Sequence, residues 1–264
     1  MKTNNSILVL VLVLIGFSVR AQDSDEELAN KLANPIANLI SVPFQMNIDN
    51  GIGTYNGTRM TLNVQPVIPL SVSDNMNLIL RWVQPVVIQY GITGAGARES
   101  GLSDAVVSGF FGPKEAKNGL TWGAGPVLLI PDGTDDALSS RKLGVGPTAV
   151  ILKQGGGITF GGLANQIWSV AGDSNRSDVS QLFFQPFFSY AWKSGASLGA
   201  NFEYTQNWEA DNSTLWFNPI LGGLTSLGKQ KVQLVIGPRF NLVAPKGAKS
   251  DFGVRAVVVF LFPK

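Results

Sequence analysis

Most of this chain consists of short runs in which apolar and polar side chains alternate at every second residue. In the first run Ile40, Val42 and Phe44 are apolar, and Ser41 and Gln45 between them are polar. A period of two is the period of a β-strand, whose successive side chains point to opposite faces. The alternation therefore predicts an all-β protein. Twelve such runs occur, over residues 38–48, 60–70, 76–88, 102–112, 120–131, 143–153, 158–169, 180–192, 197–208, 214–224, 231–243 and 252–262.

Charged residues are rare inside these runs. The five that lie well inside all fall on the polar face: Arg81, Asp104, Glu203, Arg239 and Arg255. A secreted β-sandwich, the non-membrane alternative, exposes its polar faces to water and carries many more charges there. So few charges favour a membrane barrel, in which apolar faces meet lipid and polar faces line the lumen. The five residues then either form a constriction that selects solutes by charge, or pair with one another in a filled interior.

The connectors between the runs alternate between longer ones and mostly shorter ones. Outer-membrane barrels have short periplasmic turns and longer extracellular loops, with both termini in the periplasm. We therefore predict an up-and-down antiparallel transmembrane β-barrel of about 12 strands, with a short N-terminal helix, in the outer membrane of a Gram-negative bacterium. Five tryptophans near the predicted strand ends are expected in an aromatic girdle, namely Trp122, Trp168, Trp192, Trp208 and Trp216.

The N-terminus has the pattern of a secretory signal. Lys2 precedes an apolar run from Ile7 to Phe17, and small residues occupy the cleavage positions in Val19 to Ala21. The apolar run is too short to span a bilayer. A released chain that begins near Gln22 is therefore expected.

The next residues predict a short amphipathic helix. Ser24 to Glu27 form a capping-box pattern, Leu28 and Leu32 share a face, and Pro35 ends the pattern. This helix either tucks into the mouth of the barrel or lies exposed as a lead-in. The chain is expected to divide into a signal sequence (1–21), a periplasmic segment with the helix (22–37) and the barrel (38–264).

Proline follows a glycine or an amide residue seven times inside strand-like runs. The pairs are Gln65-Pro66, Gln84-Pro85, Gly125-Pro126, Gly146-Pro147, Gln185-Pro186, Asn218-Pro219 and Gly237-Pro238. A proline lacks the N–H that pairs in a sheet, and an unpaired carbonyl in hydrocarbon is costly. We expect these pairs to mark bulges or kinks in the wall, where the preceding amide or a lumenal water reaches the carbonyl.

The composition excludes most enzyme chemistry. There is no Cys and no His, which excludes disulfides, Ser-His triads and ordinary zinc sites. We expect no catalytic residue, no metal and no cofactor, and Asp132, Asp135 and Asp136 fit a solvated loop better than a calcium site. Removing the signal takes away Lys2 and Arg20 but no acid, so the 20 basic residues become 18, equal to the 18 acidic ones. No nucleic-acid partner is expected.

Several segments resemble the outer-membrane transporter family associated with the meta-cleavage pathway of phenol degradation, some members of which carry a neuromedin U label. They are Asn34 to Gln45, Leu62 to Leu70, Gly101 to Lys114, Trp122 to Asp136, Gly146 to Gln154, Leu163 to Asp178 and the closing FLFPK. The resemblance covers nearly all of the mature chain. It implies an outer-membrane barrel and suggests uptake of hydrophobic or aromatic compounds.

The sequence thus predicts a channel or transporter for small solutes, hydrophobic or aromatic ones among them. Kinks at the prolines offer apolar solutes a lateral exit. The alternative is a barrel that conducts little and acts as a scaffold or adhesin through its outer loops. The expected partners are outer-membrane lipid, a small-molecule solute and the barrel-assembly machinery during insertion, and the oligomeric state is left open.

Overall fold

Residues 23–262 form a closed twelve-stranded antiparallel β-barrel with one short helix, as predicted. The computed structural model describes residues 23–262, and the predicted signal sequence, Gln22 and the last two residues lie outside the described part. The helix is α2 (Asp23–Leu32). The strands are β1 (Ile40–Ile52), β2 (Gly57–Val64), β3 (Val67–Ser71), β4 (Met76–Tyr90), β5 (Arg98–Leu102), β6 (Ala105–Pro113), β7 (Leu120–Ile130), β8 (Lys142–Gly155), β9 (Ile158–Gly172), β10 (Ser180–Ala191), β11 (Ala196–Asn207), β12 (Asn212–Leu227), β13 (Gln230–Val243) and β14 (Phe252–Phe262).

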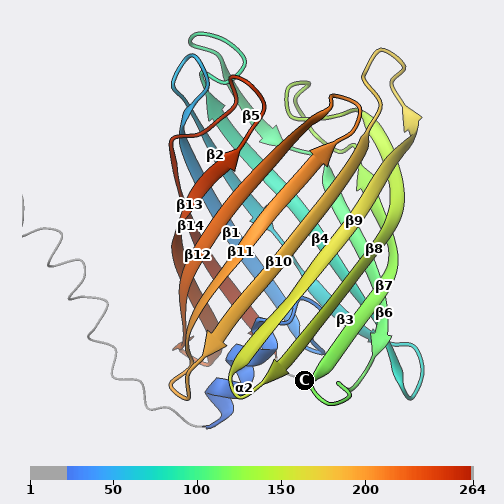
Figure 1. Ribbon diagram of the computed structural model, residues 1–264, viewed down its shortest axis with the longest axis vertical. Helices are drawn as coiled ribbons and strands as arrows, with labels where there is room; N and C mark the ends of the chain where they lie inside the picture. Colours follow the sequence, from blue (N-terminus) through green and yellow to red (C-terminus); the bar gives the residue numbers. More distant parts are fainter. Residues whose placement is uncertain (1–22, 263–264) are drawn as a thin grey trace, which may run out of the picture.

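Two of the twelve wall strands are each divided in two. β2 and β3 are separated at Gln65 and Pro66, and β5 and β6 at Ser103 and Asp104. Each strand pairs with its neighbour along the chain, and β1 pairs with β14 to close the barrel. The helix and the end of β14 lie at the end with the short turns, and the longer loops lie at the other end (Figure 1). This is the arrangement that the connector lengths predicted.

The outer wall is a belt of exposed apolar side chains. Large hydrophobic residues from neighbouring strands are about half exposed, among them Ile151 at 56%, Phe160 at 53% and Leu221 at 60%. Soluble proteins rarely expose a continuous apolar surface of this extent, whereas lipid tails solvate it. The fold is therefore that of an outer-membrane barrel of Gram-negative bacteria. None of the helices among residues 23–262 is long and apolar enough to cross a bilayer.

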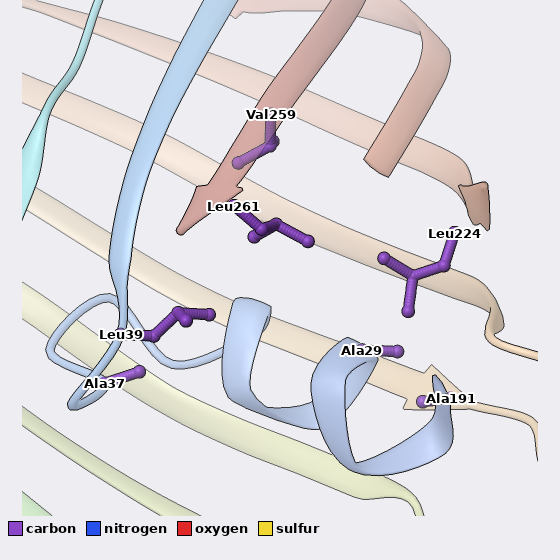
Figure 2. Packing of buried hydrophobic residues seen from close by; sticks show 7 residues of the cluster. All are labelled: Ala29, Ala37, Leu39, Ala191, Leu224, Val259 and Leu261. Carbon is purple, nitrogen blue, oxygen red and sulfur yellow. The ribbon is translucent and has the colours of Figure 1, made fainter. Parts of the chain in front are cut away.

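Two clusters of buried apolar residues lie inside the barrel near the helix end. The first joins the N-terminal segment to the last strands, and Figure 2 shows its members Ala29, Ala37, Leu39, Ala191, Leu224, Val259 and Leu261. The second comprises Ile36, Val67, Ile79, Phe110, Val150, Leu152 and Leu163. Apolar side chains therefore fill this end of the lumen.

Most of the seven prolines interrupt the hydrogen-bonded ladder without shifting its register. β6 and β7 pair at Ser108↔Val127 and again at Phe111↔Ala124, in one register across the gap that contains Pro126. Equivalent gaps occur in the β8–β9, β10–β11 and β12–β13 seams, and at the division between β2 and β3 beside β4. Pro147 lies in the β8–β9 gap, Pro186 in the β10–β11 gap, and Pro219 and Pro238 in the β12–β13 gap. Pro66 lies at the division between β2 and β3. The three register shifts within paired strands lie elsewhere, at Asn50/Ile52, Leu215/Trp216 and Leu143/Gly144.

The glycines before three of the prolines approach the opposite strand very closely. A Cβ on Gly146 would lie 1.7 Å from the carbonyl oxygen of Gln166, and one on Gly125 would lie 2.0 Å from that of Gly109. A Cβ on Gly237 would lie 1.9 Å from the carbonyl oxygen of Pro219. In each case a glycine Cα–H therefore points at a carbonyl oxygen inside a ladder gap. Such Cα–H···O contacts partly replace the N–H···O bonds that proline cannot make.

Pro85 differs from the other six prolines. Its neighbours in phase, Val87 and Gln89, are buried on the inner face, so its ring faces the lumen. Val86 pairs with Leu102 while Val83 pairs with Val106, so the facing wall strand contains one extra residue there. This is the geometry of a β-bulge.

The amide beside Pro85 replaces the missing backbone donor. Gln84 Nε2 donates a hydrogen bond to the carbonyl oxygen of Ser103 at 2.9 Å. The Ser103 N–H donates to the carbonyl oxygen of Pro85 at 2.9 Å, so the Ser103 carbonyl is the acceptor that a Pro85 N–H would have reached. At this pair the residue before the proline therefore supplies the donor. The same expectation is wrong for Gln65, Gln185 and Asn218, whose side chains bond to other side chains.

The close approach at Gly146 predicts a large effect of a single methyl group. Gly146→Ala should destabilise the barrel by about 1–3 kcal/mol, because the new Cβ would force the β8–β9 seam apart. Gly223→Ala is the matched control, because a Cβ at this strand position meets nothing within 4 Å. Urea unfolding in phospholipid vesicles measures both variants. Equal midpoints for the two would contradict the tight contact.

Candidate functional site

The N-terminal segment lies in the mouth of the barrel at the end with the short turns. α2 lies across the mouth (Figure 1), with Ala29 directed toward Ala191 and Leu224 of the wall (Figure 2). Leu28 and Leu32 pack against the same cluster. Of the two placements that the sequence allowed for the helix, the structure has the one inside the mouth. We call residues 23–39 the plug.

A few polar contacts hold the plug in place. Asp25 Oδ1 pairs with Nζ of Lys231 on β13 at 2.9 Å, and the Asp25 side chain is only 10% exposed. Gln154 Nε2 on β8 donates to the carbonyl oxygen of Asn30 at 2.7 Å. The plug is therefore held by apolar packing and a small number of separable polar bonds.

Four charged side chains meet inside the barrel. Arg239 Nε binds Asp49 Oδ1 at 3.0 Å, and Arg239 Nη1 lies 3.6 Å from Glu203 Oε2. Arg255 Nη2 binds Glu203 Oε1 at 2.9 Å, and its Nε donates to Asn47 Oδ1 at 2.8 Å. The two arginines and Asp49 are buried. This cluster connects β1, β11, β13 and β14 through side chains.

Trp216 belongs to this cluster, and its predicted place in the aromatic girdle is wrong. The Arg239 guanidinium carbon lies 4.3 Å from the centre of the Trp216 ring, the geometry of a cation–π contact. Trp216 alternates with its neighbours so that it shares the inner face with Asn218, which is fully buried. Nearness to a strand end was a misleading signal here, because the regular alternation of β12, which pairs with β11 in one register from Asn212 to Gly223, already places Trp216 on the same face as Asn218.

Two further arginines of the inner wall bind amides rather than carboxylates. Arg81 Nη2 donates to Gln65 Oε1 at 2.9 Å. Arg59 Nε donates to Gln89 Oε1 at 2.8 Å, and Gln89 Nε2 in turn donates to Glu99 Oε2 at 3.1 Å. An amide therefore links Arg59 to an acid, whereas Arg81 has no such relay among residues 23–262.

Asp104 lies apart from the four-charge cluster, at the division between β5 and β6. Its Oδ1 accepts a bond from Ser139 Oγ at 2.6 Å, and its Oδ2 accepts one from the Ser140 N–H at 2.7 Å. The Gly133 N–H also donates to Oδ1, at 3.3 Å. Asp104 thus fastens the loop between β7 and β8 to the rim of the barrel.

The three aspartates of this loop each have a separate partner. Asp132 Oδ1 accepts a bond from the Ala105 N–H at 2.9 Å. Asp135 Oδ1 accepts one from the Ala137 N–H at 2.8 Å. Asp136 Oδ1 pairs with Nη2 of Arg141 at 2.8 Å.

A cavity of about 400 Å³ lies under the Asp104 loop, at the extracellular end. Its volume falls in the range of small-molecule sites, roughly 300–1,000 Å³. One side is apolar, from Val106, Leu129, Ala137, Leu138, Ile167 and Val179, and the other carries Ser103, Asp104, Ser139, Ser140 and Gln181. This mixture suits a solute that has an apolar body and one hydrogen-bonding group.

Three of the five predicted lumenal charges, Glu203, Arg239 and Arg255, lie in the central cluster, and its fourth member, Asp49, was not predicted. Asn47 falls on the predicted polar face of the first run. Both lie on the polar face of β1, which extends to Ile52, whereas a connector was expected from Asp49 onward. The alternation through Ile48 continues past the predicted strand end, and following it would have placed Asp49 inside the lumen.

Comparisons with known proteins agree with this fold. No family model matches the chain, and no curated protein matches it. Among solved structures, an outer membrane channel from Pseudomonas putida F1 matches with a TM-score of 0.69 and 16% identity, over 87% of this chain and 97% of that one. Outer membrane phospholipase A from Escherichia coli matches with a TM-score of 0.47 and 12% identity, over 90% and 98%. The first likeness shows a shared fold, and the second carries no inference.

Breaking the central cluster should be far more costly than breaking an exposed pair. Glu203→Gln leaves Arg255 without its carboxylate and weakens the field at Arg239, so we expect a loss of about 3 kcal/mol in unfolding free energy. Glu27→Gln is the control, because the Glu27–Lys31 pair on α2 is 69% and 51% exposed and should contribute less than about 0.5 kcal/mol. Denaturant unfolding of both variants measures the difference, and similar losses would contradict a structural role for the cluster.

Proposed function

We propose that this protein is an outer-membrane channel for small solutes, including hydrophobic and aromatic compounds, and that the plug closes its periplasmic end at rest. The observation that supports this proposal is space inside the barrel at both ends, beside the plug and under the Asp104 loop. Cavities of about 400 Å³ and 170 Å³ lie there. A barrel used only as a scaffold gains nothing from lumenal cavities, since small barrels are otherwise filled by side chains.

The solute class follows from the outer cavity. Its apolar side offers burial to a hydrocarbon or aromatic group, and its serine hydroxyls and Gln181 offer hydrogen bonds to one polar group. This chemistry is consistent with the suggested membership in the family associated with phenol degradation, which we propose as well.

The interrupted seams support a second route for apolar solutes. Backbone pairing is absent at mid-depth in the gaps around Pro126, Pro147 and Pro186. Separating the wall there breaks fewer hydrogen bonds than elsewhere, so we propose these seams as candidate lateral exits to lipid.

Removing the plug tests the channel. Deleting residues 23–36 should raise single-channel conductance several-fold, because the apolar seal at the mouth is lost. Phenol at millimolar concentration should then reduce the current, whereas glycerol should not. Retained heat-modifiable migration on gels would show that the truncated barrel is folded. A folded truncated barrel that passes no current would favour the scaffold or adhesin alternative.

A milder change should loosen the plug without removing it. Asp25→Asn abolishes the ion pair with Lys231, which costs about 1 kcal/mol, so the open time should rise roughly fivefold. Glu27→Gln again serves as the control, because its partner Lys31 belongs to the same helix and does not attach α2 to the wall. Planar-bilayer recordings of the full chain measure both. An unchanged open time in Asp25→Asn would contradict the proposal that movement of the plug opens the channel.

A further inference from the structure

The cavity of about 170 Å³ lies between the plug and the inner wall. The plug contributes Lys31, Leu32 and Asn34, with Pro35, Ala37 and Leu39. The wall contributes residues from β1, β3, β4, β13 and β14, with Gln65 from the division between β2 and β3. The cavity is therefore assembled only when the plug is seated.

Hydrogen-bond donors converge on this cavity in excess of acceptors. Arg81 has five N–H groups, and within residues 23–262 its one hydrogen bond is to Gln65. Gln233 and Ser41 also line the cavity and are more than nine-tenths buried. Neither of their side chains makes a hydrogen bond within that same part of the chain. The donors that no acceptor of residues 23–262 takes up therefore face the cavity, where an acceptor from outside the chain can bind them.

The charge at the cavity is also uncompensated. Among the ion pairs of residues 23–262 none includes Arg81. Glu203 attracts Arg81 at longer range, but it already pairs with Arg239 and Arg255. Lys31, the other cation at the cavity, is neutralised by Glu27 at 2.6 Å. Arg81 is thus the lining cation that is available to an anion.

The remaining lining selects for an organic anion. Leu32, Leu39, Val67 and Val259 add apolar surface to the same cavity. Val67 lies directly beside Arg81 and Ser41, and Val259 lies beside Gln233. An apolar cavity of about 150 Å³ accepts a benzene ring, so a volume of about 170 Å³ accommodates a ring or short chain with one charged group. A guanidinium binds a carboxylate through two parallel hydrogen bonds.

We propose that this cavity binds a small organic carboxylate, with Arg81 as its charged donor and Gln233 and Ser41 as neutral donors. The site lies just behind the plug, at the last position before the periplasm. Its role in transport rests on the proposed channel function, whereas binding itself does not. A carboxylate seated here contacts both the wall and the plug.

Fluorine NMR of the full-length barrel in detergent tests the site, with 4-fluorobenzoate as the probe and 4-fluorobenzyl alcohol as its neutral counterpart. Empty micelles give the baseline for partitioning. We expect saturable binding of the anion, and at least tenfold weaker binding of the alcohol.

Arg81→Gln should weaken anion binding at least tenfold and leave binding of the alcohol unchanged, and Arg81→Lys should retain part of the affinity for the anion. Arg98→Gln is the matched control, because Arg98 lies over the Tyr90 ring at 5.1 Å on the outer face, and it should bind like the native protein.

A second variant guards against an effect of misfolding. Ser41→Leu fills the cavity without altering Arg81 and should abolish binding of both probes. Equal anion affinity in the native protein and Arg81→Gln would overturn the proposal, and so would competition by chloride as strong as that by acetate, because chloride lacks the organic group. Arg81-dependent binding in a barrel that never conducts would leave this site standing and overturn the channel. Conduction after plug removal without Arg81-dependent binding would support the channel and overturn this carboxylate site.

Discussion

The constraint on which this structure depends is the pairing of backbone groups in hydrocarbon. No water reaches the middle of a bilayer, so each N–H and C=O there needs a partner within the protein, and an open sheet edge is excluded. The β1–β14 seam meets this requirement, with an unbroken register from Ile40↔Phe262 to Asn50↔Phe252. The apolar outer belt and the polar lumen both follow from this closure, because a closed sheet has only two faces.

The prolines show how the wall tolerates exceptions to that constraint. Pro126 and Pro147 face each other across the β7–β8 seam, so their missing donors fall in the neighbouring β6–β7 and β8–β9 seams. Those seams join strands connected by short turns, whereas the β7–β8, β9–β10 and β11–β12 seams remain continuous. The barrel thus consists of strand pairs that are joined by the longer loops and fully paired, and these pairs meet at seams with interrupted pairing. Glycine Cα–H groups and the Gln84 amide partly compensate for the lost bonds.

The sequence predicted the features that depend on the period of alternation and on connector length. It failed for individual residues whose position depends on strand ends, bulges or contacts with distant parts of the chain. The twelve strands and the side on which the termini lie follow from alternation and connector length. Asp49 was assigned to a connector because the predicted strand was ended at Ile48, whereas pairing with β14 continues through Asp49 and Asn50. Asp104 is on a predicted strand, yet the bulge opposite Pro85 directs it to the loop serines. Trp216 was assigned to the girdle from its nearness to a strand end, although the alternation of β12 places it on the inner face with Asn218.

The distribution of charge in the lumen distinguishes structure from selection. Asp49, Glu203, Arg239 and Arg255 satisfy one another on strands at and near the closing seam, and their arrangement is explained by the stability of a buried network. The same explanation does not extend to Arg81, because a barrel under selection for stability alone would have placed an acid beside it. Burying a guanidinium against an amide and a cavity is costly. The position therefore makes physical sense when a transient anion supplies the missing charge, and a plug that completes the cavity would respond to its arrival.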